Sequence, residues 1–158
     1  QLNEGSGNNE IWLNNENVAS LIREMPVAEK VSEVAALGEV REFAVAQQQL
    51  IGAEKGIVMD GRDIGTVVFP KAKVKIFMTA SAEIRAKRRF EELQSKGQKV
   101  SLQEVYANVV QRDEQDSNRK DSPLLQAEDA ILLDNSFLSK EEQFQKVMAI
   151  LASKGINF

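Results

Sequence analysis

The chain has 158 residues, of which 42% are hydrophobic, and a formal net charge of -4. This length supports one globular unit with a sizeable core and a small subdomain. The acidic balance argues against nonspecific binding to nucleic acid or anionic membranes, so we expect any basic site to be local. The sequence contains no cysteine and no histidine. Disulfides, thiolate nucleophiles and histidine-dependent sites are therefore excluded, and the remaining carboxylates, cations and hydroxyls suit magnesium and phosphate chemistry.

The first third of the chain is predicted to hold a hairpin and two helices. Residues 1–9 are polar and rich in glycine and asparagine, which predicts a disordered lead-in. Residues 10–22 contain two short apolar stretches around an Asn-Asn pair, a composition typical of a small hairpin. Apolar spacings of three and four predict a helix from residue 27 and, after Gly38, a second helix over about residues 39–51.

The rest of the chain alternates apolar segments with helical patterns. Buried strands are predicted over three segments: residues 57–60, 74–80 and 130–136. Helices are predicted over three others: from the N-cap Ser81 to about residue 95, over residues 101–120 behind a Ser101–Glu104 capping box, and over residues 139–154. This alternation predicts an α/β fold in which helices cover a parallel sheet. The apolar runs are shorter than a bilayer span and no signal peptide is evident, so we expect a cytoplasmic protein.

Charged and polar side chains follow each predicted strand, where ligands of parallel sheets bind. They are Asp60, Arg62 and Asp63 after the first strand, Ser81, Arg85, Arg88 and Arg89 after the second, and Asp134, Asn135 and Ser136 after the third. We therefore expect a ligand site at this edge of the sheet.

The segment Gly56–Pro70 combines charge with glycine directly behind the first apolar run. Asp60 has the position of a Walker B carboxylate, which orients magnesium, although aspartate also commonly ends a strand at a turn. Arg62 is a bidentate donor suited to phosphate, and Gly61 and Gly65 permit close approach of the backbone to a ligand.

Two further groups of arginines have helical spacing. Arg85, Arg88 and Arg89 share one helical face, which fits either a phosphate clamp or a solvated helix balanced by neighbouring glutamates.

Arg112, Asp116 and Arg119 also share one face, which fits either ordinary surface ion pairs or a face that closes over a nucleotide. Ser32 and Arg41, taken alone, fit an amphipathic surface.

In order and approximate spacing, five segments resemble the bacterial cytidylate kinases: "DGRDIGTVVFP", "VKIFMTAS", "RAKRR", "QRDEQDSNR" and "ILLDNS". The resemblance runs from about Glu10 to the carboxyl end. It implies a P-loop nucleoside monophosphate kinase that transfers the γ-phosphoryl group of ATP to CMP or dCMP with magnesium. It also implies small-molecule partners, no nucleic acid or membrane partner, and a monomer in the intact enzyme.

The resemblance implies roles for individual residues. For the acceptor nucleotide, it places Ser32, Arg41, Asp63 and Arg119 around cytosine, Arg62 on the monophosphate, and Arg112 and Asp116 on ribose and phosphate from a mobile lid. For the donor nucleotide, it places Arg88 on the ATP phosphates, with Arg85 or Arg89 as alternatives. It places Asp60 on the metal. Arg88, Arg112 and Asp116 are the expected catalytic residues.

The resemblance also implies a domain organisation. The expected fold is an incomplete P-loop NTPase-like parallel sheet with flanking helices, a small monophosphate-binding insert and a helical lid. The expected parts are the lead-in 1–9, the insert 10–50, the core 51–93 and 124–158, and the lid 94–123.

One departure from the family pattern is large, because the chain contains no G-x-x-x-x-G-K-[ST] phosphate loop. We therefore expect the chain to be the carboxyl-terminal portion of a cytidylate kinase, inactive alone, with a sheet edge that favours dimerisation. Two alternatives stay open: a noncatalytic nucleotide-binding or interaction module, and a kinase for another small acceptor.

Overall fold

The computed structural model of the chain describes residues 10–23, 25–35 and 37–156. The chain divides into two compact units, one ending at Gln47 and the other beginning at Gln48. Among the described residues, no helix is long and apolar enough to cross a membrane.

The first unit contains the predicted hairpin and helices. Its elements are β1 (Trp12–Leu13), β2 (Glu16–Asn17), the short 3₁₀ helix η1 (Leu21–Arg23), α1 (Met25–Ala35) and the start of α2 (Gly38–Gly52). The antiparallel pairing of β1 with β2 leaves Asn14 and Asn15 as a two-residue turn, with φ values of 49° and 67°. Asparagine tolerates this left-handed backbone, which explains why the Asn-Asn pair forms the hairpin turn. The hairpin and both helices predicted from the sequence are confirmed.

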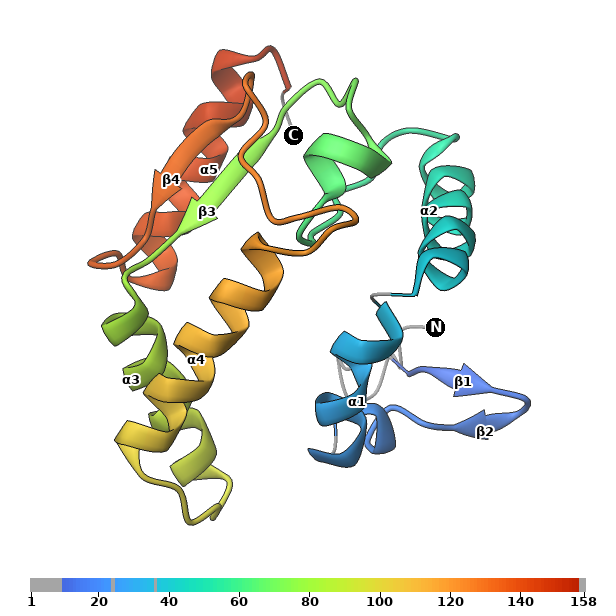
Figure 1. Cartoon of the computed structure of the whole chain (residues 1–158). Coiled ribbons are helices and arrows are strands. Elements are labelled where there is room, and N and C mark those ends of the chain that lie inside the picture. Colours follow the sequence, from blue (N-terminus) through green and yellow to red (C-terminus); the bar gives the residue numbers. More distant parts are fainter. Residues whose placement is uncertain (1–9, 24, 36, 157–158) are drawn as a thin grey trace. The chain divides into compact units, whose positions relative to one another are not determined.

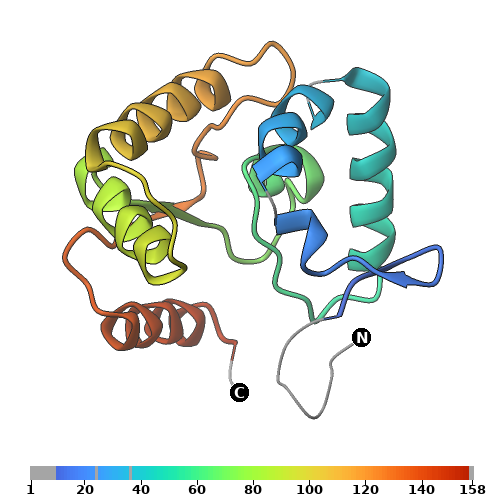
Figure 2. The ribbon, with the colours of Figure 1, turned by 90° about the horizontal axis from the view of Figure 1, so that it is seen from below.

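The second unit is built around a small parallel sheet. Its further elements are the π-helical segment η2 (Ile64–Val68), β3 (Ile76–Thr79), α3 (Ala82–Ser95), α4 (Leu102–Ser117), β4 (Ile131–Asp134) and α5 (Lys140–Ser153). β3 pairs with β4 in parallel, from Ile76 opposite Ile131 to Thr79 opposite Asp134. Figures 1 and 2 show α5 along one face of this sheet. The sheet and its helices confirm the α/β class expected from the sequence.

α3 and α4 form an antiparallel helical hairpin (Figure 1). Ala86, Leu93 and Val105 form its apolar centre, with Phe90, Val100 and Val109 packed around them. The predicted caps are present, because Ser81 accepts a hydrogen bond from the Ile84 amide and Ser101 forms the capping box with Glu104. These polar caps fix where both helices begin, and the apolar stripe forms their contact face.

The predicted strand over residues 57–60 is wrong. The segment has no regular structure, and Val58 is 95% exposed. An apolar run supplies the side chains of a buried strand, but a strand also needs a neighbour for its backbone hydrogen bonds. No described segment pairs with these residues, so Asp60 lies in an exposed loop instead of at a strand end.

Candidate functional site

The segment that carries Arg62 is anchored by an unusual turn. Asp63 caps η2, and its carbonyl accepts hydrogen bonds from the amides of Thr66 (3.3 Å), Val67 (2.8 Å) and Val68 (3.2 Å). Asp63 and Val68 are both buried. Such π-helical turns are rare and often occur at functional sites. The turn gives "GRDIGTVV" a fixed backbone, which the sequence pattern did not reveal.

The carboxyl end of α2 holds this turn from one side. The Gln49 side-chain amide donates to the Val68 carbonyl at 3.1 Å. Gly52 faces the ring of Phe69 so closely that an added Cβ would lie 2.4 Å from two ring carbons. A larger residue at position 52 would therefore force the Phe69 ring to shift, and the base of the Arg62 segment is tightly packed.

Three arginines surround the carboxylate of Asp116. Arg62 donates from Nε to Asp116 Oδ2, while Arg112 Nε and Arg119 Nη2 lie 3.9 and 3.7 Å from the two carboxylate oxygens. The structure thus joins Arg62 to the predicted Arg112, Asp116 and Arg119 set. Three cations against one anion leave an excess of positive charge, as an anion-binding site requires. We call these four residues the Asp116 cluster.

Burial makes the Asp116 cluster more than a surface ion-pair pattern. The Asp116 side chain is 10% exposed and that of Arg119 is 15% exposed. Among the described residues, Arg119 Nε and Nη2 are buried with no hydrogen-bond acceptor. A buried donor without an acceptor costs about 1–3 kcal/mol. Oxygen atoms of a bound ligand would satisfy both donors.

The electrostatics of the Asp116 cluster agree with its excess of positive charge. Partial desolvation lowers the pKa of Arg112 below the usual guanidinium value, and the neighbouring Arg62 cation adds to this effect. Because guanidinium groups stay charged even when their pKa falls somewhat, the cluster carries its cations near neutral pH. A phosphate group placed there would relieve their mutual repulsion.

The three arginines of α3 contact three different partners. Arg85 donates to both carboxylate oxygens of Asp113 on α4, at 2.8 and 2.6 Å, and from Nε to the Ala80 carbonyl at 2.9 Å. Arg89 donates to Glu92 at 2.8 Å within its own helix. The structure therefore does not gather these arginines into one clamp.

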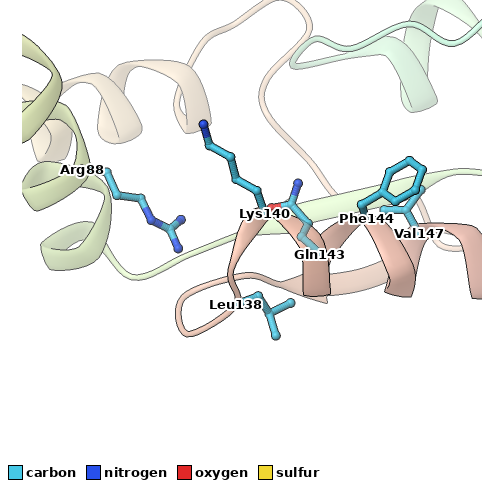
Figure 3. Close-up of a pocket in the computed structure, with 6 residues that line it drawn as sticks. All are labelled: Arg88, Leu138, Lys140, Gln143, Phe144 and Val147. Carbon is cyan, nitrogen blue, oxygen red and sulfur yellow. The ribbon is translucent and has the colours of Figure 1, made fainter.

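Arg88 reaches the loop that follows β4. Its guanidinium donates to the Asn135 carbonyl at 2.7 Å and to the Asn135 side chain at 3.1 Å. It also lines a cavity of 630 Å³ together with Leu138, Lys140, Gln143, Phe144 and Val147. Figure 3 shows Arg88 extending from α3 toward the residues of α5. The cavity combines two cations with an apolar wall, a lining suited to a ligand with both anionic and apolar parts.

Of the other predicted site residues, Ser32 and Arg41 belong to the first unit and Asp60 belongs to the second. Ser32 belongs to α1, and its side chain lies outside the described part of the chain. Arg41 is half-buried on α2. Asp60 is exposed, and the described residues contain no group of three or more acidic side chains that could hold a metal ion.

Sequence reasoning missed Asp113. The residue stands in the quoted "QRDEQDSNRK", but its pairing with Arg85 connects two helices and leaves no spacing signal within either one. The only sequence feature that pointed to an ion pair at Asp113 was the alternation of positive and negative residues along this helix.

Comparisons with known proteins give the chain its family. A family model described as "Cytidylate kinase" matches residues 1–153. A cytidylate kinase of Flavobacterium johnsoniae is 57% identical over 96% of the chain and 66% of that protein. A cytidylate kinase of Bacteroides fragilis is 55% identical over 94% of the chain and 65% of that protein. A cytidylate kinase of Phocaeicola vulgatus is 61% identical over 84% of the chain and 58% of that protein. The chain thus spans between 58% and 66% of the lengths of these relatives, which is less than two thirds, and it belongs to the cytidylate kinase family.

Proposed function

We propose that the whole protein transfers the γ-phosphoryl group of ATP to CMP or dCMP, and that this chain supplies the site for the acceptor nucleotide. Membership of the cytidylate kinase family supports the reaction. The buried Nε and Nη2 donors of Arg119 carry the proposal, because no described residue accepts a hydrogen bond from them, although Asp116 lies within ion-pair distance of Nη2. A nucleoside monophosphate offers such oxygens on its base, ribose and phosphate.

The proposed roles within the acceptor site follow charge and position. Arg62 and Arg112 bind the phosphate, since guanidinium groups match its oxygens bidentately. Asp116 orients Arg62 and accepts hydrogen bonds from ribose hydroxyls. Asp63 and Arg119 contact cytosine, a role that the family resemblance also implies for Ser32 and Arg41. Phosphoryl transfer depends mainly on positioning and charge stabilisation, which these groups provide.

The donor side of the site is less complete in this chain. We propose that Arg88 faces the ATP phosphates from the cavity beside α5. The sequence contains no phosphate-loop motif, so the chain by itself is expected to be inactive. Magnesium would be held mainly by nucleotide phosphates, with Asp60 as one carboxylate ligand, a donor set that fits this ion.

Calorimetry on the chain tests the acceptor site without requiring turnover. We expect CMP to bind at least tenfold more tightly than UMP or AMP. Arg119→Gln should weaken CMP binding at least tenfold, whereas Lys120→Gln, which removes the same charge from the exposed next residue, should leave it unchanged. Equal affinity for the three nucleotides, or equal CMP affinity of both variants, would contradict the proposal.

The missing phosphate loop favours a second candidate, a noncatalytic nucleotide-binding module. The two candidates differ in turnover of the whole protein with ATP, magnesium and CMP, which only the kinase supports. Turnover of this chain alone at the rate of an intact kinase would contradict its expected inactivity.

A further inference from the structure

The Arg85–Asp113 contact lies at the junction of three elements. Through Arg85 it connects the Ala80 carbonyl, directly after β3, to the first turns of α3 and to Asp113 near the carboxyl end of α4. The two side chains are 37% and 41% exposed, so the contact is half-buried. We call this contact the Arg85–Asp113 clasp.

The clasp lies beyond the apolar contact between the two helices. The apolar cluster includes α4 residues up to Val109, but α4 continues to Ser117. Arg112 precedes Asp113 directly, and Asp116 follows it by three residues, within one helical turn. The clasp thus fixes the same turn of α4 that carries two members of the Asp116 cluster.

The charges of the clasp balance each other. The hydrogen bonds from Arg85 lower the pKa of Asp113, and the same bonds raise the pKa of Arg85. Both groups therefore stay ionised near neutral pH. The excess positive charge remains with the Asp116 cluster.

We propose that Arg85 and Asp113 are positioning residues, which hold the last turns of α4 so that Arg112 and Asp116 meet Arg62. This inference rests on the acceptor site proposed above. It gives Arg85 a role different from direct contact with ATP, because its Nε, Nη1 and Nη2 groups all donate to protein acceptors. The clasp acts on the nucleotide only through the orientation of its neighbours.

The Asp113→Asn variant distinguishes a positioning role from simple electrostatic attraction, because the two explanations predict opposite changes in CMP affinity. Removal of a negative charge near a phosphate site, and release of the Arg85 cation, should strengthen CMP binding by attraction alone. Loss of the clasp should instead weaken it, and we expect at least a fivefold increase in the dissociation constant measured by calorimetry. Unchanged or tighter CMP binding would overturn the proposal.

A double-mutant cycle tests whether both residues act through one contact. Arg85→Gln should weaken CMP binding to a similar degree, and the double variant with Asp113→Asn should bind no more weakly than the weaker single variant. Arg85→Lys keeps the charge but not the planar fork, so it should restore only part of the affinity. Lys87→Gln, an exposed charge removal on the same helix, is the matched control and should have no effect. Additive losses would contradict a shared contact.

An NMR signature separates this inference from the proposed function. The Nε–H resonance of Arg62 reports its hydrogen bond to Asp116 without any nucleotide. Asp113→Asn should move this resonance toward that of a solvent-exposed arginine, and Lys87→Gln should not. A wild-type chain that fails to bind CMP would refute the acceptor site alone, while an unmoved Arg62 resonance in Asp113→Asn would refute the clasp.

Discussion

Replacement of Asp116 by asparagine should both destabilise the chain and increase its response to phosphate. The change removes the acceptor charge for Arg62 and leaves three cations close together. A hydrogen bond to a charged group contributes about 1.5–3 kcal/mol. Breaking a fully buried ion pair costs about 3–5 kcal/mol, but Arg62 is 39% exposed and water screens part of the effect. We therefore expect the free energy of unfolding to fall by about 2–3 kcal/mol.

Urea denaturation with and without inorganic phosphate measures both effects. Phosphate should replace the missing anion in the Asp116→Asn variant and raise its unfolding free energy more than that of the wild type, by linkage between binding and stability. Glu92→Gln is the matched control, because Glu92 also contacts two cations, Arg89 and Lys96, but lies on the exposed surface. It should cost less than about 1 kcal/mol.

Two outcomes with these variants would contradict the expected role of the Asp116 cluster. If Asp116→Asn is no more destabilising than Glu92→Gln, then burial does not strengthen the Asp116 cluster. If phosphate stabilises Asp116→Asn no more than the wild type, the three arginines do not form an anion site.

Three further predictions follow from single contacts. Because Arg85 lowers the pKa of Asp113, the wild type should be more stable than Asp113→Asn, and the full difference should be present above about pH 4. The difference should disappear as the pH falls through the lowered pKa. Acid titrations followed by circular dichroism measure this difference, and a value unchanged down to about pH 2 would contradict the prediction. Gly52→Ala should cost about 1–3 kcal/mol through overpacking against Phe69, whereas Gly38→Ala, where an added Cβ meets nothing within 4 Å, should cost nothing in the same urea assay. Ser101→Ala should lower the unfolding free energy by about 1 kcal/mol through loss of the capping box, and equal thermal stability of variant and wild type would show that the box contributes nothing.

Local signals explain why most helices and the hairpin were predictable. The Asn14–Asn15 turn and the serine caps of α3, α4 and α5 act within a few residues, so the sequence contains the complete signal. The prediction of a strand over residues 57–60 was wrong because a strand needs a neighbouring strand for its backbone hydrogen bonds, and the local sequence does not specify that neighbour. The π-helical turn after Asp63 was missed for a related reason. Its packing against Gly52 and Gln49 comes from a separate helix.

The candidate site was predictable in part. Helical spacing correctly placed Arg112, Asp116 and Arg119 together, because residues three and four apart share a helical face. Spacing also grouped Arg85, Arg88 and Arg89, yet each side chain bonds to a different partner. Long side chains on one face can diverge, and only the positions of neighbouring acceptors decide their direction. The entry of Arg62 into the Asp116 cluster likewise required the tertiary fold.

The helical hairpin of α3 and α4 also bears on the order in which the chain folds. Its contacts join residues that are close in sequence, across the short connection between the two helices, whereas β3 must find β4 across the whole hairpin. Local contacts form faster than distant ones, because they close smaller loops. We therefore expect α4 to present Arg112 and Asp116 early, and the sheet to form around a hairpin that already exists.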